Sequence, residues 1–86
     1  MIKSMKENIR KNLPDISSEL SWIIEECGKL LFKNKWDHFR PPQIVNIKYS
    51  EKGFKLIKDI YTNYKGEELN DLINYLFSSS LNKLIT

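Results

Sequence analysis

The chain has 86 residues, of which 41% are hydrophobic and 29% are charged, and its formal net charge at pH 7 is +3. These values are ordinary for a globular protein, so the composition excludes a disordered tail, a collagen-like chain and a membrane protein. A chain of this size is expected to form a single helical domain over residues 1–86. No apolar run exceeds three residues, which is too short to span a bilayer.

The N-terminal residues and the cysteine content bear on localisation. Lys3 and Lys6 are not followed by a continuous apolar stretch or a small-residue cleavage site, so no secretion signal is expected. Cys27 is the single cysteine, so no internal disulfide can form, which agrees with a reducing compartment. We therefore expect a cytoplasmic protein.

Charge is distributed unevenly along the chain. Residues 15–27 carry four acids and no base, for a net charge of −4, whereas residues 28–58 carry eight bases and two acids, for a net charge of +6. A basic block beside acidic helices indicates either an anionic partner or charge matching between neighbouring helices. Charge matching and ordinary solvation are favoured, because runs of charge usually face water.

The hydrophobic periodicity predicts four helices, and the first two precede residue 34. The first covers residues 4–12, where Ser4 and Glu7 have the spacing of a capping box. In the second helix Glu25 and Glu26 lie off the apolar stripe and are expected to face solvent. Gly28 within it indicates either the close approach of a neighbouring helix or a break in the helix. The stripe itself consists of Ile16, Leu20, Ile23, Ile24, Cys27, Leu30 and Leu31.

The third and fourth predicted helices occupy the C-terminal part of the chain. The third follows Ser50 and ends at Lys65, with Gly66 as its stop. The fourth opens at Glu67 and continues through the serines at 78–80. The apolar face of the third is predicted to be Phe54, Ile57, Ile60, Tyr61 and Tyr64, and that of the fourth Leu69, Leu72, Ile73, Leu76, Phe77, Leu81 and Leu84.

Residues 34–50 are predicted to form an extended connector. Arg40-Pro41-Pro42 does not fit a helix interior, because the second proline forces the first out of helical geometry. Residues 44–49 alternate as a strand does, and their available partner is Leu30–Trp36, so a short β-hairpin is one option. A helix from Pro42 through Ser50 is the competing interpretation. The predicted fold is therefore mainly α, a compact four-helix bundle with an extended 34–50 connector.

The side chains needed for catalysis are scarce. His38 is the single histidine, and Cys27 falls on the apolar stripe, where a small buried side chain is far more common than a nucleophile. Cys27, Asp37 and His38 do not supply a zinc-ligand set, and the three glycines cannot form a phosphate-binding loop. We expect a protein that is not an enzyme and that has no catalytic residue, metal or cofactor.

The segment from Lys33 to Arg40 is the candidate binding surface. It mixes rings with bases, and such mixtures occur at protein interfaces and on single-stranded nucleic acid. The alternative is that Trp36 and Phe39 fold over the open end of the bundle, and Trp22 is similarly either the edge of the core or an exposed anchor. The predicted partner-contact residues are Trp36, His38, Phe39 and Arg40, with Lys33, Lys35 and Lys48 steering the partner.

The segment Leu72-Ile73-Asn74-Tyr75-Leu76-Phe77, followed by Asn82-Lys83-Leu84, is similar to a helix of the small basic cytosolic immunity proteins that protect bacteria against their own peptide bacteriocins. In that family a further helix and tail follow the matching helix, which is the last one here. The resemblance implies a non-catalytic four-helix bundle. Its partner would be another protein (a toxin, a bacteriocin or its receptor), which it would neutralise by occlusion.

A second segment, Ile47 to Ile57, resembles the junction between the wing and the final helix of winged-helix regulators. That resemblance implies a nucleic-acid-binding regulator, dimeric through its last helix, with a β-hairpin between Leu30 and Tyr49. Acidic residues on the second helix, which would read the groove, would repel phosphates, so protein binding is favoured. A subunit that buries an exposed Trp22 in a larger assembly is a third hypothesis, and the oligomeric state stays open.

Overall fold

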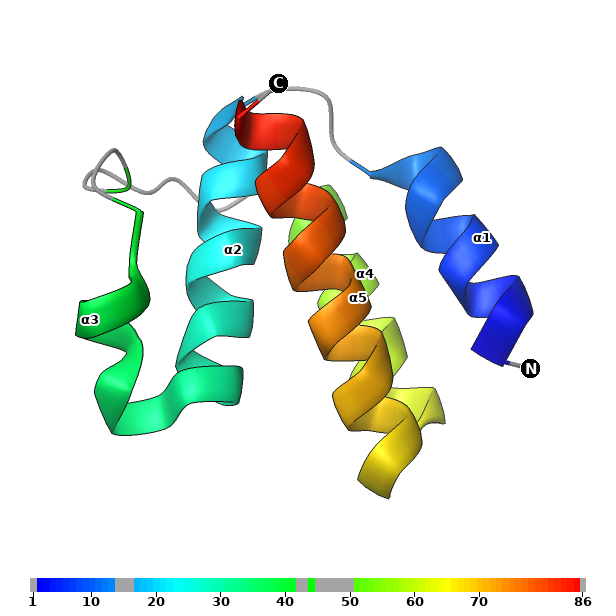
Figure 1. The fold of residues 1–86 in the computed structure, drawn as a ribbon. Coiled ribbons are helices and arrows are strands. Elements are labelled where there is room, and N and C mark those ends of the chain that lie inside the picture. Colours follow the sequence, from blue (N-terminus) through cyan, green and yellow to red (C-terminus); the bar gives the residue numbers. More distant parts are fainter. Residues whose placement is uncertain (1, 14–16, 42–43, 45–50, 86) are drawn as a thin grey trace.

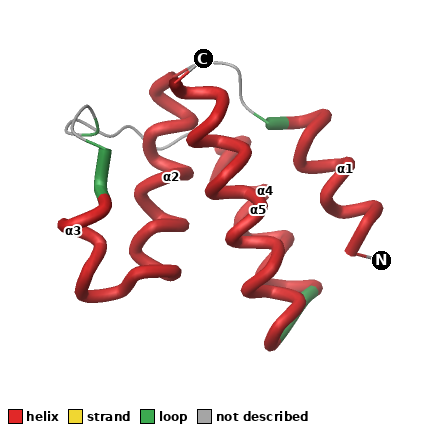
Figure 2. Tube along the Cα trace, in the orientation of Figure 1, coloured by secondary structure: helices red, strands yellow, loops and turns green. Residues whose placement is uncertain are grey.

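The computed structural model describes residues 2–13, 17–41, 44 and 51–85, and every element in that part of the chain is helical (Figures 1 and 2). The predicted four-helix bundle is confirmed, and one short helix is added to it. The elements are α1 (Ile2–Asn12), α2 (Ser17–Phe32), a 3-10 turn η1 (Lys33–Lys35), α3 (Trp36–Phe39), α4 (Glu51–Asn63) and α5 (Gly66–Ile85).

Helices α2 and α5 pack along each other at the centre of the molecule (Figure 1). Helix α1 lies on the outer side of α5, α3 lies on the outer side of α2, and α4 contacts both central helices. The Cα radius of gyration is 12.1 Å, which agrees with the value of about 12 Å expected for a compact chain of this length. None of the helices in this part of the chain is both long enough and apolar enough to cross a membrane.

The hydrophobic core has two clusters, one on each side of α2. The larger cluster joins α1, α2, α4 and α5, and the smaller one joins α2 and α5 to the segment from α3 to Ile44. The buried members of the larger cluster are Ile9, Leu13, Leu20, Trp22, Ile23, Cys27, Leu56, Ile60, Leu72, Ile73 and Leu76. The buried members of the smaller cluster are Ile24, Trp36 and Ile44, against which Phe32, Phe77, Leu81 and Leu84 pack.

Helix α2 is buried on more than its predicted stripe, because it has neighbours on several sides. Trp22 is buried within the chain, so it belongs to the core and the hypothesis that a larger assembly covers it loses its basis. Leu30, predicted to be in the core, is exposed. Gly28 does not break the helix; it allows the indole of Trp36 to approach closely.

Helix α4 is rotated about its axis relative to the sequence prediction. Ile60 and Leu56 are buried, whereas Phe54 and Tyr61, predicted to face the core, are exposed. The physical reason is Gly53, whose missing side chain leaves room for the Trp22 indole: a Cβ there would lie 2.8 Å from the Trp22 Cζ2 atom. The close approach at this glycine fixes which face of α4 points inward.

Helix α5 follows the prediction. It begins at Gly66 and continues without interruption through Ser78–Ser80, and Ser80 is fully buried. Gly66, the first residue of α5, has a φ of +63°, a conformation that glycine adopts at no steric cost. Helix α4 ends at Asn63, before the end predicted at Lys65.

The predicted extended connector is wrong in its first part. Residues 33–39 form η1 and α3, and Leu30–Phe32 belong to α2, so the proposed first strand of a hairpin is helical. The chain becomes extended only at Arg40, with φ −63° and ψ 129°, as expected for a residue before proline. Ile44 is buried and its amide donates to the Pro41 carbonyl. The rest of the predicted strand, residues 45–49, lies outside the described residues.

Candidate functional site

The candidate binding segment, Lys33 to Arg40, consists of the turn η1 after α2 and the short helix α3. Helix α2 ends at Phe32, and Lys33 takes a φ of +51°, which redirects the chain into η1. Helix α3 has four residues and closes with the Arg40 amide donating to the Trp36 carbonyl at 2.9 Å. Because the turn is short and hydrogen-bonded, the side chains between Lys33 and Arg40 point in several directions and do not form one continuous face.

Trp36 does not contribute to an exposed surface. Its side chain is 2% exposed and its ring packs over Gly28. It is also stacked on Phe32, with ring centroids 5.9 Å apart, and meets the Phe77 ring edge-on at 5.9 Å. The prediction that Trp36 contacts a partner is therefore wrong, and the alternative that it folds onto the bundle holds for this residue.

Phe39 behaves differently, since it is 56% exposed. Its ring lies against that of Phe32, with centroids 4.8 Å apart, and Phe32 in turn meets Phe77 of α5 at 5.6 Å. An aromatic row thus runs from the buried Trp36 through the half-buried Phe32 to the exposed Phe39. Phe39 therefore contacts the Phe32 ring on its inner face, and its outer face is exposed to water.

Arg40 is bound within the protein. Its guanidinium pairs with the Glu25 carboxylate of α2 at 2.6 Å and with Asp37 at 3.2 Å. The Glu25 side chain is only 5% exposed, which corrects the prediction that it faces solvent. The predicted charge matching between neighbouring helices therefore occurs at this point, and again between Lys6 of α1 and Asp71 of α5 at 3.0 Å. Arg40 serves to fasten α3 onto α2, and this use was not visible in the sequence.

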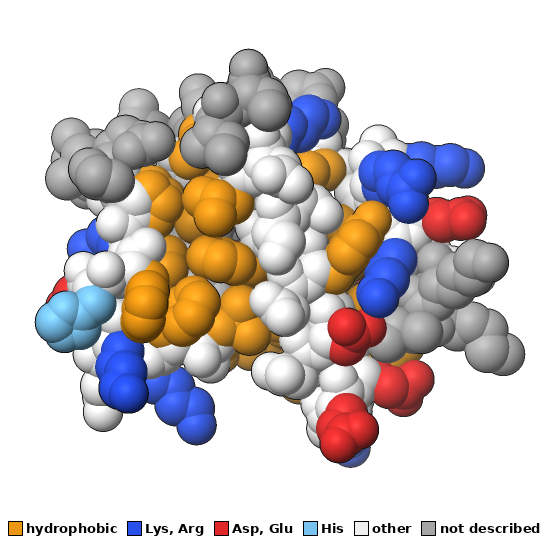
Figure 3. All heavy atoms as spheres, in the orientation of Figure 1, with side chains coloured by type: hydrophobic (Ala, Val, Ile, Leu, Met, Phe, Trp, Pro, Cys, Tyr) orange, Lys and Arg blue, Asp and Glu red, His pale blue; other side chains and the backbone are white. Residues whose placement is uncertain are grey.

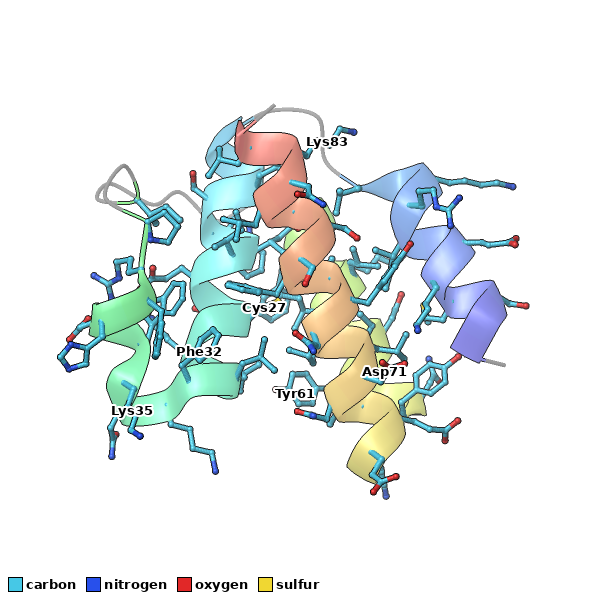
Figure 4. The ribbon with its side chains drawn as sticks, viewed as in Figure 1. Cys27, Phe32, Lys35, Tyr61, Asp71 and Lys83 are labelled. Atoms are coloured by element: carbon cyan, nitrogen blue, oxygen red, sulfur yellow. The ribbon has the colours of Figure 1, made fainter. Side chains whose placement is uncertain are left out.

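The remaining predicted residues stay at the surface. Lys33, Lys35 and His38 are exposed, and Figure 3 shows basic side chains beside an apolar area at the α3 end of the molecule. Lys48 lies outside the described residues. We use the name α3 surface for Lys35, His38, Phe39 and the half-buried Phe32, with Phe32 and Lys35 marked in Figure 4.

Cys27 does not supply this surface with a reactive group. Burial raises the pKa of the Cys27 thiol from its ordinary value of 9.0 to about 12, and the charge of Glu26 adds to the effect. The thiol is therefore protonated at neutral pH and has no access to solvent. Within residues 2–13, 17–41, 44 and 51–85, no three His, Cys, Asp or Glu side chains come together as a metal site would require.

A groove of about 230 Å³, which the sequence did not predict, is lined by none of the α3 surface residues. It is enclosed by the end of α2, the end of α4 and the start of α5, with Gly66 at one edge. Figure 4 shows Tyr61 between the end of α2 and the first half of α5. Leu30 and Tyr61, both assigned to apolar faces, are half-exposed where they line this groove. Its other lining residues are Leu31, Leu69, Asn70 and Ile73.

Comparisons with protein-family models, with curated proteins and with solved structures give no match to this chain. The observations that bear on function are consequently those of the chain itself: the α3 surface, the groove and the internal charge pairs.

Proposed function

We propose that this protein is a non-catalytic protein-binding module of the immunity type, which neutralises a toxin or bacteriocin by covering the surface that the toxin needs. The contact would be made by the α3 surface. Trp36 and Arg40 are removed from the predicted contact set, because one is buried and the other is held by Glu25.

The observation that carries the proposal is the exposure of Phe39 on a rigid support. An aromatic side chain with more than half of its surface in water contributes favourably to binding when a partner covers it, because apolar surface is removed from water. The ring contact with Phe32, at 4.8 Å, orients Phe39 before any partner arrives, so little side-chain entropy is lost on binding. Aromatic residues held in this way are typical of the few positions that dominate binding energy at protein interfaces.

The charges around Phe39 favour a partner with acidic groups. Lys33 and Lys35 are exposed in the same turn, and the one nearby exposed acid, Asp37, contacts the Arg40 guanidinium, which Glu25 shares. Exposed bases at the rim of an interface mainly raise the rate of association with an acidic surface. We therefore expect the partner to present an apolar patch flanked by Asp or Glu.

The alternative, a winged-helix regulator of nucleic acid, loses one of its structural requirements. That interpretation needs a hairpin whose first strand is Leu30–Trp36, and this segment is the end of α2 followed by η1 and α3. Glu25 also lies within the helix that would enter the groove of the nucleic acid, paired with Arg40.

The proposal is tested by a pull-down from the native host with the tagged protein, and a toxin or bacteriocin captured in this way is then produced together with the chain and isolated as a complex. Phe39→Ala should weaken that complex about thirtyfold or more, the usual effect at a dominant interface position. Phe54→Ala is the matched control, because Phe54 is 58% exposed on α4 and lies away from the α3 surface. Equal effects of the two substitutions, or no complex together with a salt-sensitive gel shift on DNA, would overturn the proposal.

A further inference from the structure

Helix α1 is attached to the rest of the molecule mainly through α5. It lies on the outer side of that helix, whereas α2 packs on both α4 and α5, and α4 also packs on α5 (Figure 1). The contacts that hold α2, α4 and α5 together therefore do not involve α1.

The apolar attachment of α1 consists of few side chains. Ile9 and the following Leu13 are buried in the larger core cluster, and Met5 packs against it. An isolated helix of 11 residues is only marginally stable in water, so α1 depends on this docking to stay helical. The exposed side chains of α1 are Ser4, Glu7, Asn8, Arg10 and Lys11.

The polar attachment of α1 is centred on Lys6. Its ammonium group lies 3.0 Å from the Asp71 carboxylate of α5 and 5.3 Å from the centroid of the Tyr75 ring. Asp71 and Tyr75 are one helical turn apart, so a single cation contacts both, and Figure 4 shows Asp71 on the side of α5 that faces α1. The Arg10 guanidinium, one turn after Lys6, donates a hydrogen bond to the Tyr75 side chain.

This ion pair is open to solvent. The Lys6 side chain is 34% exposed and that of Asp71 is 52% exposed, so dissolved ions screen their attraction. The pair that fastens α3 onto α2 differs in this respect, because the Glu25 side chain is only 5% exposed. Added salt should therefore weaken the attachment of α1 more than that of α3.

We propose that α1 detaches from α5 as a unit while α2, α4 and α5 stay folded, and that the Lys6 contacts set how often it does so. Segments with few buried apolar contacts and solvent-exposed polar ones open below the free energy of global unfolding. In the open state Ile9 and Leu13 leave the core cluster, and the side of α5 around Tyr75 becomes accessible. The inference is independent of the proposed function, since α1 contributes no residue to the α3 surface.

Native-state hydrogen exchange followed by mass spectrometry tests the proposal. The amides of residues 6–12 should exchange together, and at least about tenfold faster than the slowest amides of α2 and α5. Lys6→Gln should speed the exchange of α1 about threefold to tenfold, because it removes the ion pair and the cation–π contact. Sodium chloride at about 0.5 M should speed it about twofold in the wild type and have little effect in Lys6→Gln.

Lys11→Gln is the matched control, because it makes the same change of charge on the same helix. Lys11 is exposed and forms no ion pair with another described residue, so its replacement should change the exchange of α1 by less than about twofold. Unchanged exchange in α2 and α5 shows that both variants are folded.

Four results would overturn the proposal. The first is exchange of residues 6–12 as slow as that of α2 and α5, and the second is a graded exchange from the N-terminus, as fraying gives. The third is an equal effect of Lys6→Gln and Lys11→Gln on α1. The fourth is an effect of Lys6→Gln on α2 and α5 that equals its effect on α1, which would show that α1 opens only when the whole chain unfolds.

Discussion

The indole of Trp36 lies directly on the backbone of Gly28, so that a Cβ at position 28 would come within 3.0 Å of three carbon atoms of the ring. This contact joins α3 to α2 and buries the residue that the sequence had suggested as an exposed anchor. Only a glycine in α2 leaves enough room, which explains why the helix tolerates a residue that costs about 1 kcal/mol relative to alanine in a helix interior.

We therefore predict that Gly28→Ala destabilises the protein by about 1–2 kcal/mol. The added methyl group must displace the Trp36 ring, and overpacking of this kind costs about 1–3 kcal/mol, which exceeds the gain in helix propensity. Urea unfolding followed by circular dichroism measures the change.

The same substitution made in a Trp36→Leu background serves as its control. Without the indole, alanine at position 28 should raise the stability by up to about 1 kcal/mol. A Gly28→Ala effect of the same sign in both backgrounds would contradict the contact.

Arg40 and Glu25 give a second prediction. Arg40→Gln leaves the Glu25 carboxylate, 5% exposed, without its charged partner at 2.6 Å. Because the Arg40 side chain itself is 36% exposed, we expect a loss of about 1–3 kcal/mol, which is less than for a fully buried pair. Chemical denaturation measures this loss.

Asp37→Asn is the reference for that measurement, since Asp37 also pairs with Arg40 but is 83% exposed. Its effect should stay below about 0.5 kcal/mol. The double variant E25Q/R40Q should recover part of the loss, because no buried charge remains. Equal effects of Arg40→Gln and Asp37→Asn would show that the buried pair does not hold α3 in place.

Lys33 provides a third prediction through its backbone. Its φ of +51° is a left-handed conformation that glycine adopts more readily than a residue with a Cβ. Lys33→Gly should therefore raise the free energy of unfolding by about 0.5–1 kcal/mol, measured by urea unfolding. Asn34 has no positive φ, so Asn34→Gly should lower the stability instead. Destabilisation by both glycines would contradict the left-handed turn.

Cys27 gives a prediction on pH dependence. The thiol has a pKa of about 12 in the folded protein and an ordinary value of 9.0. Between these values the unfolded chain binds fewer protons than the folded one, so the free energy of unfolding falls as the pH rises, by up to about 1.4 kcal/mol per pH unit. The stability that the raised pKa of Cys27 contributes is fully present below pH 9.0 and is lost as the pH rises towards 12. Denaturant titrations on either side of pH 9.0 measure this slope.

The Cys27→Ala variant lacks this ionisation and should show a shallower decline over the same range, although other groups will still titrate. Iodoacetamide gives an independent check: the native thiol should react only as fast as the chain opens, whereas the unfolded chain should react at the rate of a free cysteine. Rapid modification of the folded protein would contradict the burial of Cys27.

The helices themselves could be predicted from the sequence, because helical periodicity is a local property. The stripe through Leu20, Ile23 and Cys27 predicted α2, and the fourth predicted helix continued through the serines at 78–80 as the structure does. The break between the last two helices was also predicted near Gly66, although α4 ends at Asn63 instead of Lys65 and Gly66 is itself the first residue of α5.

What only the tertiary structure decided was which side chains of α3 and α4 became buried and which polar groups were buried with them. Gly53 lets Trp22 approach α4 and so turns Phe54 outward, Gly28 receives Trp36, and the buried Glu25 depends on Arg40 from a later turn. Each of these outcomes joins residues far apart or in different helices. No spacing along the chain encodes such a contact, because it exists only once two helix surfaces have come together.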